Sequence, residues 1–250
     1  MCDTVPPEGA GTPAAFVCRR PGPFSVNNGP AVCVALSGRF GATPMNDADA
    51  ILHAAEDVVS ILQEHRVDAV VIGAVALAAF HYVRYTEDVD LGVNADLPTL
   101  RAVADSLRRV GYSVDLREPD AIDPLGGVID VSGSFGLIQI VSFADRFPAV
   151  VDDAVRLSSS LVRAGSPLRL VPFSQLIALK LYAGGHKSKA DIIELLARNP
   201  ECDLDEVRRT CARYRLTGLD ELIAESGITG CDRRMDVLPH EQGNDQTAGH

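Results

Sequence analysis

One stretch, residues 70–93, constrains the fold more than any other part of the chain. It reads as a buried strand, a glycine at Gly73, a short apolar helix, a polar turn and a second strand. On the second strand Asp88 and Asp90 alternate with apolar residues. Because strand side chains alternate between faces, the two aspartates share one face and their apolar neighbours enter the core. The stretch therefore predicts a sheet whose buried strand carries a pair of carboxylates.

Two carboxylates side by side repel each other, and an apolar setting increases the repulsion. A hard divalent cation relieves it, and oxygen ligands of this kind suit Mg²⁺. Gly73 allows a tight turn into the helix, whose first amides would point at an anion such as phosphate. The chain has neither GxGxxG nor GxxxxGK[ST], so a dinucleotide site and a P-loop are not indicated. Together these features favour a nucleoside triphosphate bound with Mg²⁺. A plain tight-turn glycine and a solvated acidic pair remain the structural alternatives.

Composition narrows the class of protein. With 250 residues, 46% of them hydrophobic, the chain can bury the core of one or two compact domains. The net charge of −11 argues against non-specific nucleic-acid binding through a broad basic surface, although a local basic groove stays open. The six cysteines form no CxxC pair, and the start of the chain lacks a secretory leader pattern. We therefore expect reduced thiols, a cytoplasmic location and no membrane partner.

Four segments are expected along the chain. Residues 1–44 are rich in proline and glycine, which predicts a disordered arm. Residues 45–172 form the expected core domain, and residues 173–226 a C-terminal helical region that completes its cleft. The polar tail, residues 227–250, is expected to be disordered.

Hydrophobic periodicity and turn residues place the individual elements. Helices are expected at 47–64, 74–83, 97–110, 147–155, 175–182, 188–197, 203–214 and 219–225. Strands are expected at 67–72, 88–93, 112–116, 128–131 and 135–141, with a short pair at 161–162 and 168–171. The small polar residues at 132–134 predict a hairpin between the two strands that they separate.

Two blocks of the sequence resemble a known family. The first resembles the motif "GG.A…H…R.T.D.DL" through Gly73, Ala74, Ala76, His81, Arg84, Thr86, Asp88, Asp90 and Leu91. The second resembles the motif "vp…LiaLK…ag…..Di..Ll" through residues 171–180, 184–185 and 191–196. The family is the AbiEii-type nucleotidyltransferases of the polymerase-beta-like superfamily, and the resemblance covers roughly residues 45–200. It implies an α+β fold with a small mixed sheet flanked by helices and a C-terminal helical extension.

The resemblance also implies roles for individual residues. Asp88 and Asp90 would be catalytic and would bind the metal ions. The nucleotide and its phosphates would be bound by Gly73, Ala74, Arg84, Thr86 and Lys180. For several of these residues a structural role is an alternative: Arg84 would pair with Glu87 or Asp88, Thr86 would cap the turn, and Lys180 would be an ordinary lysine at a helix edge.

The third carboxylate of the superfamily has no clear counterpart. The matching strand, 136–141, carries Gln139 where an aspartate is usual. Asp130 on the partner strand is the nearby acidic substitute, and we take it as the third catalytic candidate. Whether Asp130, Gln139 or neither fills the position stays open at this point.

The implied activity is Mg²⁺-dependent transfer of a nucleoside monophosphate from an NTP to a hydroxyl on RNA, a protein or a small molecule. One version of this hypothesis is the toxin of a toxin–antitoxin or phage-defence pair, with an antitoxin protein as partner. The rival is a catalytically weakened member that acts as a nucleotide- or partner-binding module. Gln139 and Ala74 favour the rival, whereas the intact aspartate pair favours catalysis. A different phosphate enzyme using the same cleft is a third alternative.

Overall fold

The computed structural model describes residues 47–84, 86, 88–119 and 125–228, which belong to one compact unit. The arm predicted at 1–44 and most of the tail predicted at 227–250 lie outside the described residues. No described helix is both long and apolar enough to cross a membrane.

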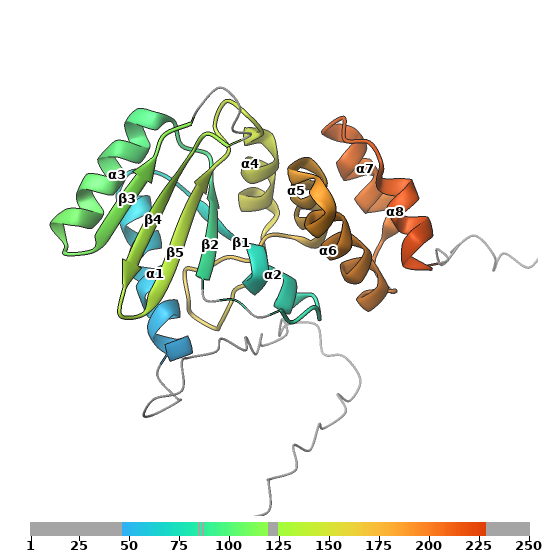
Figure 1. Ribbon diagram of the computed structural model, residues 1–250, viewed down its shortest axis with the longest axis horizontal. Helices are drawn as coiled ribbons and strands as arrows, with labels where there is room; N and C mark the ends of the chain where they lie inside the picture. Colours follow the sequence, from blue (N-terminus) through green and yellow to red (C-terminus); the bar gives the residue numbers. More distant parts are fainter. Residues whose placement is uncertain (1–46, 85, 87, 120–124, 229–250) are drawn as a thin grey trace, which may run out of the picture. The chain divides into compact units, whose positions relative to one another are not determined.

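Five strands form a mixed sheet in the order β1-β2-β5-β4-β3 (Figure 1). Strand β2 runs parallel to β5, and the other neighbouring pairs are antiparallel. The predicted α+β class with a small mixed sheet is therefore confirmed, as is the hairpin of β4 and β5. The strands are β1 (Ala69–Ile72), β2 (Asp88–Val93), β3 (Ser113–Arg117), β4 (Gly127–Gly133) and β5 (Gly136–Ser142).

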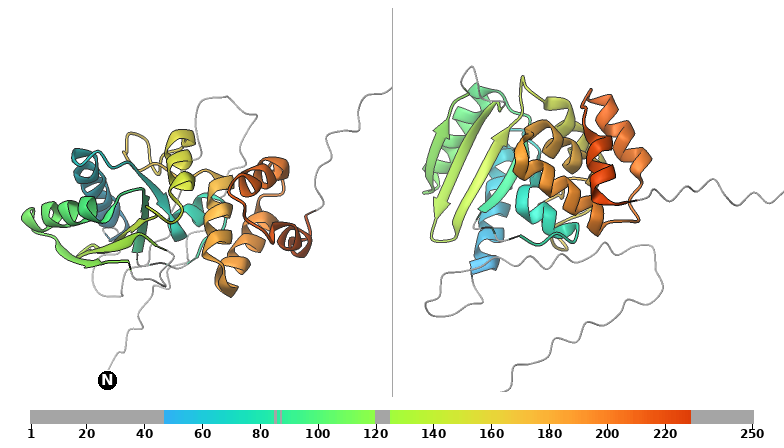
Figure 2. Two further views of the ribbon diagram at one scale, coloured as in Figure 1. Left: turned by 90° about the horizontal axis from the view of Figure 1, so that it is seen from above. Right: turned by 45° about the vertical axis from the view of Figure 1, so that its right-hand side comes forward.

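Helices α1 (Asp47–Glu64) and α3 (Leu97–Arg109) cover one face of the sheet (Figures 1 and 2). The side chains of Val89 and Leu91 on β2 are fully buried against them, in one cluster with Ile138 and Ile140 of β5. Helix α3 begins at Asp96, whose carboxylate accepts a hydrogen bond from the amide of Thr99. Side chains alternate along β2 as the sequence predicts, and the apolar face of the strand packs against α1 and α3.

The remaining helices contribute to a second apolar cluster, which includes Val70 of β1 (Figure 2). They are α2 (Gly73–Ala79), α4 (Pro148–Leu157), α5 (Phe173–Ala183), α6 (Gly185–Arg198), α7 (Leu204–Arg213) and α8 (Leu219–Ser226). Helix α5 begins where the helical region was expected to begin. Its Ile177 belongs to the same buried cluster as Val70 of β1 and Leu77 of α2. The helical region therefore shares a core with the sheet.

Three elements differ from the expected ones. Helix α2 ends at Ala79, not at residue 83, because the amides of Phe80 and Tyr82 both bond back to the carbonyl of Leu77. Helix α6 begins at Gly185, three residues earlier than expected, directly after the turn at Gly184. The expected strand pair at 161–162 and 168–171 is reduced to isolated bridges, one of which joins the chain to the outer edge of β1.

Candidate functional site

The acidic pair lies on the face of β2 that points away from α1 and α3. Asp88 and Asp90 are both half-buried, whereas Val89 between them is completely buried. In the sheet register, Asp90 is the direct neighbour of Ile72 on β1 and of Gln139 on β5. The two carboxylates thus sit near the start of the second strand of the sheet, beside the start of α2.

Gly73 makes the close approach of Asp90 to α2 sterically possible. Its φ is +65°, and a Cβ atom placed there would overlap the Asp90 carboxylate. The sequence indicated a tight-turn glycine, but the register of β1 against β2, which brings Asp90 to this glycine, was not readable from it. The neighbouring Ala74 is buried, so its side chain belongs to the core.

The charges around Asp90 oppose one another. Burial, together with the negative charge of Asp88, raises the pKa of Asp90 to about 6. Lys180, Arg84 and Lys187 act in the other direction and lower it. Lys187 is not singled out by the sequence analysis. The site therefore combines two carboxylates and three cations.

A buried carboxylate, Asp191 of α6, holds two of these cations. Asp191 is 2% exposed. Lys180 Nζ lies 2.7 Å from its Oδ2, and Arg84 Nη1 lies 3.1 Å from its Oδ1. Arg84 and Lys180 thus come together at the site as expected, and both contact Asp191. The sequence signal for it was its place in the second motif block, to which no role was given.

Thr86 secures the other aspartate. Its hydroxyl donates a hydrogen bond to the Asp88 carboxylate, and the amide of Asp88 donates to the same hydroxyl at 3.3 Å. Thr86 is buried, so this hydrogen bond is shielded from water. The residue therefore orients Asp88, and its expected contact with nucleotide stays a prediction.

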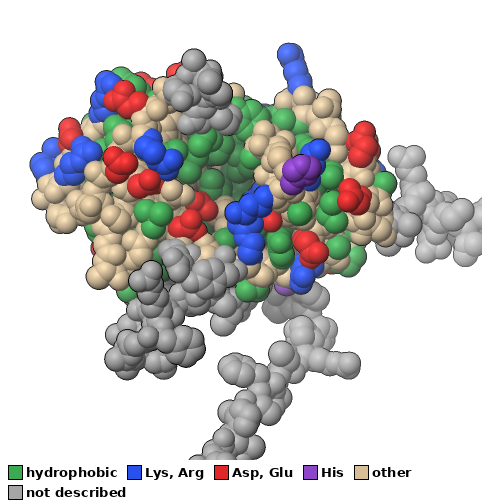
Figure 3. Space-filling view, viewed as in Figure 1, with side chains coloured by type: hydrophobic (Ala, Val, Ile, Leu, Met, Phe, Trp, Pro, Cys, Tyr) green, Lys and Arg blue, Asp and Glu red, His purple; other side chains and the backbone are tan. Residues whose placement is uncertain are grey.

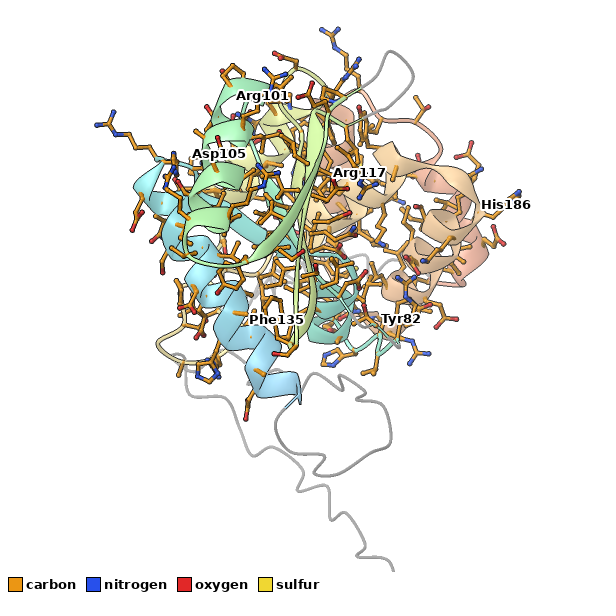
Figure 4. The ribbon with its side chains drawn as sticks, turned by 60° about the vertical axis from the view of Figure 1, so that its left-hand side comes forward. Tyr82, Arg101, Asp105, Arg117, Phe135 and His186 are labelled. Carbon is orange, nitrogen blue, oxygen red and sulfur yellow. The ribbon has the colours of Figure 1, made fainter. Side chains whose placement is uncertain are left out.

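Asp130 lies one strand beyond Gln139, which separates it from the acidic pair. In register, Gln139 pairs with Asp90 on one side and with Asp130 on the other. Its Nε2 donates to Asp130 Oδ1 at 2.7 Å, and Arg117 Nη2 contacts the same carboxylate at 3.1 Å. Figure 4 shows Arg117 on the side of the sheet opposite α1 and α3.

The donor set fits Mg²⁺ as a substrate-bound ion. Among the described residues, no group of three or more His, Cys, Asp or Glu side chains is placed to hold a metal. Asp88 and Asp90 alone supply two carboxylates, and Mg²⁺ commonly binds through one or two carboxylates together with water and substrate phosphates. On the face seen in Figure 3, acidic and basic side chains face each other at the rim of a hollow with an apolar floor.

Comparison with known proteins finds distant similarity in fold only. No protein-family model and no curated protein matches the chain. The antibiotic-resistance factor ANT(2'')-Ia is similar at 18% identity over 68% of this chain and 92% of that chain, with a TM-score of 0.43. An antigenic nucleotidyltransferase-like protein from Paracoccidioides brasiliensis follows at 14% identity over 71% and 93%, with a TM-score of 0.42. The Megavirus polyadenylate synthase is similar at 11% identity over 64% of this chain and 33% of that chain, with a TM-score of 0.38.

Proposed function

We propose that this protein is a Mg²⁺-dependent nucleotidyltransferase that moves a nucleoside monophosphate from an NTP to a hydroxyl acceptor. One observation carries the proposal: two carboxylates, Asp88 and Asp90, share a site with Arg84 and Lys180. If these four residues had only a structural role, we would expect the two aspartates to form salt bridges with Arg84 and Lys180. Here both cations contact Asp191, and among the described residues neither Asp88 nor Asp90 forms a salt bridge.

The charge balance suits a triphosphate with its metal. Arg84 and Lys180 share the single carboxylate of Asp191, which leaves one unit of positive charge to attract phosphate oxygens. Lys187 adds a third cation close enough to affect Asp90. The acidic pair is the complementary half of the site, because it would bind the cation that accompanies the triphosphate.

Each residue has a separate task in the transfer. A bound Mg²⁺ would neutralise charge on the reacting phosphate and lower the pKa of the attacking hydroxyl. Asp88, oriented by Thr86, and Asp90, packed against Gly73, would hold that ion in a fixed position. Arg84 and Lys180 would bind the phosphates and stabilise the charge of the departing pyrophosphate.

The finer assignment comes from the sequence resemblance. The motif blocks at 73–91 and 171–196 resemble AbiEii-type proteins. On that basis we propose a toxin of a toxin–antitoxin or phage-defence pair that works in the cytoplasm, with an antitoxin protein as partner. The acceptor class would then be RNA, a protein or a small molecule.

The direct test is label transfer. The full chain is incubated with each α-labelled NTP, Mg²⁺ and, separately, total RNA, total protein or a small-molecule extract. We expect a labelled acceptor with at least one NTP and none with Asp88→Asn or Asp90→Asn. Asp115→Asn is the matched control, because this aspartate is exposed on the same sheet but lies on the edge strand β3.

Two outcomes would count against the proposal. Label transfer that persists in both aspartate variants would remove these residues from the reaction. Mg²⁺-dependent nucleotide binding without any transfer would favour the alternative of a nucleotide-binding module, for which Gln139 in place of a carboxylate is the specific supporting observation.

A further inference from the structure

We infer that Gln139 presents its Oε1 to the cation site of Asp88 and Asp90, and that Asp130 is a positioning residue that fixes this amide. The inference rests on the proposed function, since it concerns the same site. According to this inference, the third oxygen ligand beside Asp90 is the neutral amide oxygen of Gln139. Asp130 would act on the cation only through Gln139.

The sheet register places the three side chains in one row. Asp90, Gln139 and Asp130 are direct partners across β2, β5 and β4. Direct partners on neighbouring strands project from the same face of a sheet. Neighbouring strands lie roughly 4.8 Å apart, so the backbone of Asp130 is about 10 Å from that of Asp90, with Gln139 between them. An ion that contacts Asp90 is therefore next to Gln139 and two strands away from Asp130.

The partner of Asp130 fixes the orientation of the amide. An ionised carboxylate only accepts hydrogen bonds, so the Gln139 atom facing it must be the Nε2 donor. That bond is 2.7 Å long. The guanidinium of Arg117 lies 3.1 Å from the same carboxylate and forms a salt bridge with it. The Oε1 atom is consequently the branch directed away from Asp130, and among the described residues no donor is bonded to it.

The consequence is a cation site with a charge of −2 from its carboxylates and a neutral third oxygen. An amide oxygen is a good ligand for a hard cation. It does not take up a proton near neutral pH, so Gln139 would bind and orient but would not act as a base. Asp130, hydrogen-bonded to Gln139 and Arg117, would act only through the amide that it holds, as outer partners of metal ligands commonly do.

The test measures binding of Mn²⁺ alone, as a paramagnetic substitute for Mg²⁺, to the full chain by EPR. For Gln139→Met, which keeps the length but removes the amide oxygen, we expect about tenfold weaker binding. For Asp130→Asn we expect a smaller loss, because an asparagine can accept or donate and no longer fixes the amide. The double variant should bind no more weakly than Gln139→Met. Asp115→Asn, the register partner of Asp130 on the exposed edge, should bind like the unaltered protein.

A conservative variant separates ligation from packing. Gln139→Glu keeps an oxygen at the position, so its Mn²⁺ affinity should equal or exceed that of the unaltered protein. Equal losses in Gln139→Met and Gln139→Glu would overturn the inference, as would unchanged binding in Gln139→Met. An additive loss in the double variant would overturn the role given to Asp130. Thermal melting of each variant shows that it is folded.

Failure of this inference is distinguishable from failure of the proposed function. If Asp88→Asn and Asp90→Asn abolish Mn²⁺ binding while the variants at Gln139 do not change it, only the inference fails. If the two aspartate variants bind Mn²⁺ as well as the unaltered protein, the proposed site itself is wrong.

Discussion

The carboxylate of Asp90 is an energetically costly group in the free protein. Burial and the charge of Asp88 oppose its ionisation and raise its pKa to about 6, although three cations act against this effect. Ionisation near neutral pH therefore costs the folded chain free energy that a bound cation would recover. Such a conflict is typical of groups whose task is binding or catalysis.

The first prediction concerns Asp90 and pH. Because the folded-state pKa, about 6, lies above the model value of 3.8, the folded chain binds more protons than the unfolded chain between these values. The contribution of Asp90 to stability should thus be fully present below about pH 4 and be lost as the pH rises through 6. Asp90→Asn removes this loss, so we expect it to be about 2–3 kcal/mol more stable at pH 7.5 and no more stable at pH 4.

Urea unfolding at the two pH values checks this prediction. Added Mg²⁺ should raise the midpoint of the unaltered protein but not that of Asp90→Asn, because only the former binds the ion. Equal stability of the two proteins at pH 7.5 would show that ionisation of Asp90 does not destabilise the folded protein.

The second prediction concerns Gly73. Gly73→Ala should abolish Mn²⁺ binding and nucleotidyl transfer, because its Cβ would displace the Asp90 carboxylate. Gly111→Ala is the matched control: it also has a positive φ, +101°, but nothing lies within 4 Å of its added Cβ. Both substitutions should destabilise the protein by about 1 kcal/mol through the backbone conformation. Normal Mn²⁺ binding by Gly73→Ala would contradict the close packing of Asp90 on this turn.

At this scale the sequence predicts the position of a side chain on its own strand better than it predicts the contacts of that side chain. Asp88 and Asp90 follow from alternation along a single strand, which is a local property. The partners of Asp90 could not be predicted, because Gln139 reaches it only through the parallel pairing of β2 with β5, far along the chain. Asp191 was missed for the same reason: its contacts with Arg84 and Lys180 depend on how α6 packs.

At the scale of elements, helix α7 is tied to α4 by a buried carboxylate. Asp153 of α4 is 6% exposed and accepts a hydrogen bond of 2.7 Å from the hydroxyl of Tyr214, which follows α7. The same carboxylate forms salt bridges with Arg213, whose Nη2 lies 3.1 Å from Oδ2, and with Arg156, whose Nη2 lies 2.9 Å from Oδ1. These contacts connect the last helices to the sheet domain.

The third prediction tests this connection. Tyr214→Phe should lower the free energy of unfolding by about 1–2 kcal/mol, because it removes a buried hydrogen bond to a charged group. Tyr112→Phe is the control, since its hydroxyl makes only a long bond of 3.4 Å to Asp57 at an exposed position; we expect a change within about 0.5 kcal/mol. If denaturant unfolding showed the same loss of free energy for both variants, the hydrogen bond from Tyr214 to Asp153 would not contribute more than an exposed one.

The helices and strands themselves were largely predictable. Helix α1 follows from its apolar period and matches its expected bounds. The sequence predicts α2 four residues too long, because no glycine or proline follows Ala79 and the helix ends through the hydrogen bonds from Phe80 and Tyr82 back to the Leu77 carbonyl. Termination by backbone geometry leaves little signal in the sequence when no glycine or proline marks it.

At the scale of the molecule, the two expected regions share an apolar cluster. The sequence suggested a core at 45–172 and a helical region at 173–226. The structure begins α5 near that boundary, but the apolar cluster around Ile177 continues into β1 and α2. Two segments that share a core are not expected to unfold independently.

The fourth prediction follows from this shared core. Ile177→Ala, at a completely buried position of α5, should cost about 2–5 kcal/mol. Thermal unfolding should still show one transition, and hydrogen exchange should become faster in β1 as well as in α5. Ile138→Ala is the comparison variant, because it makes the same substitution at a buried position of the other apolar cluster. Two transitions, of which only one moves, would show that the helical region is a separate domain.

The alternation along β2 also acts on folding. A slip of this strand by one residue would exchange its two faces, which would bring Asp88 and Asp90 under α1 and α3 and expose Val89 and Leu91. Desolvating two unpaired anions is far more costly than losing a few ladder bonds. The carboxylates proposed to bind Mg²⁺ therefore also disfavour the shifted register of β2. Replacing both with apolar residues would make this mispairing less costly, in addition to abolishing any activity.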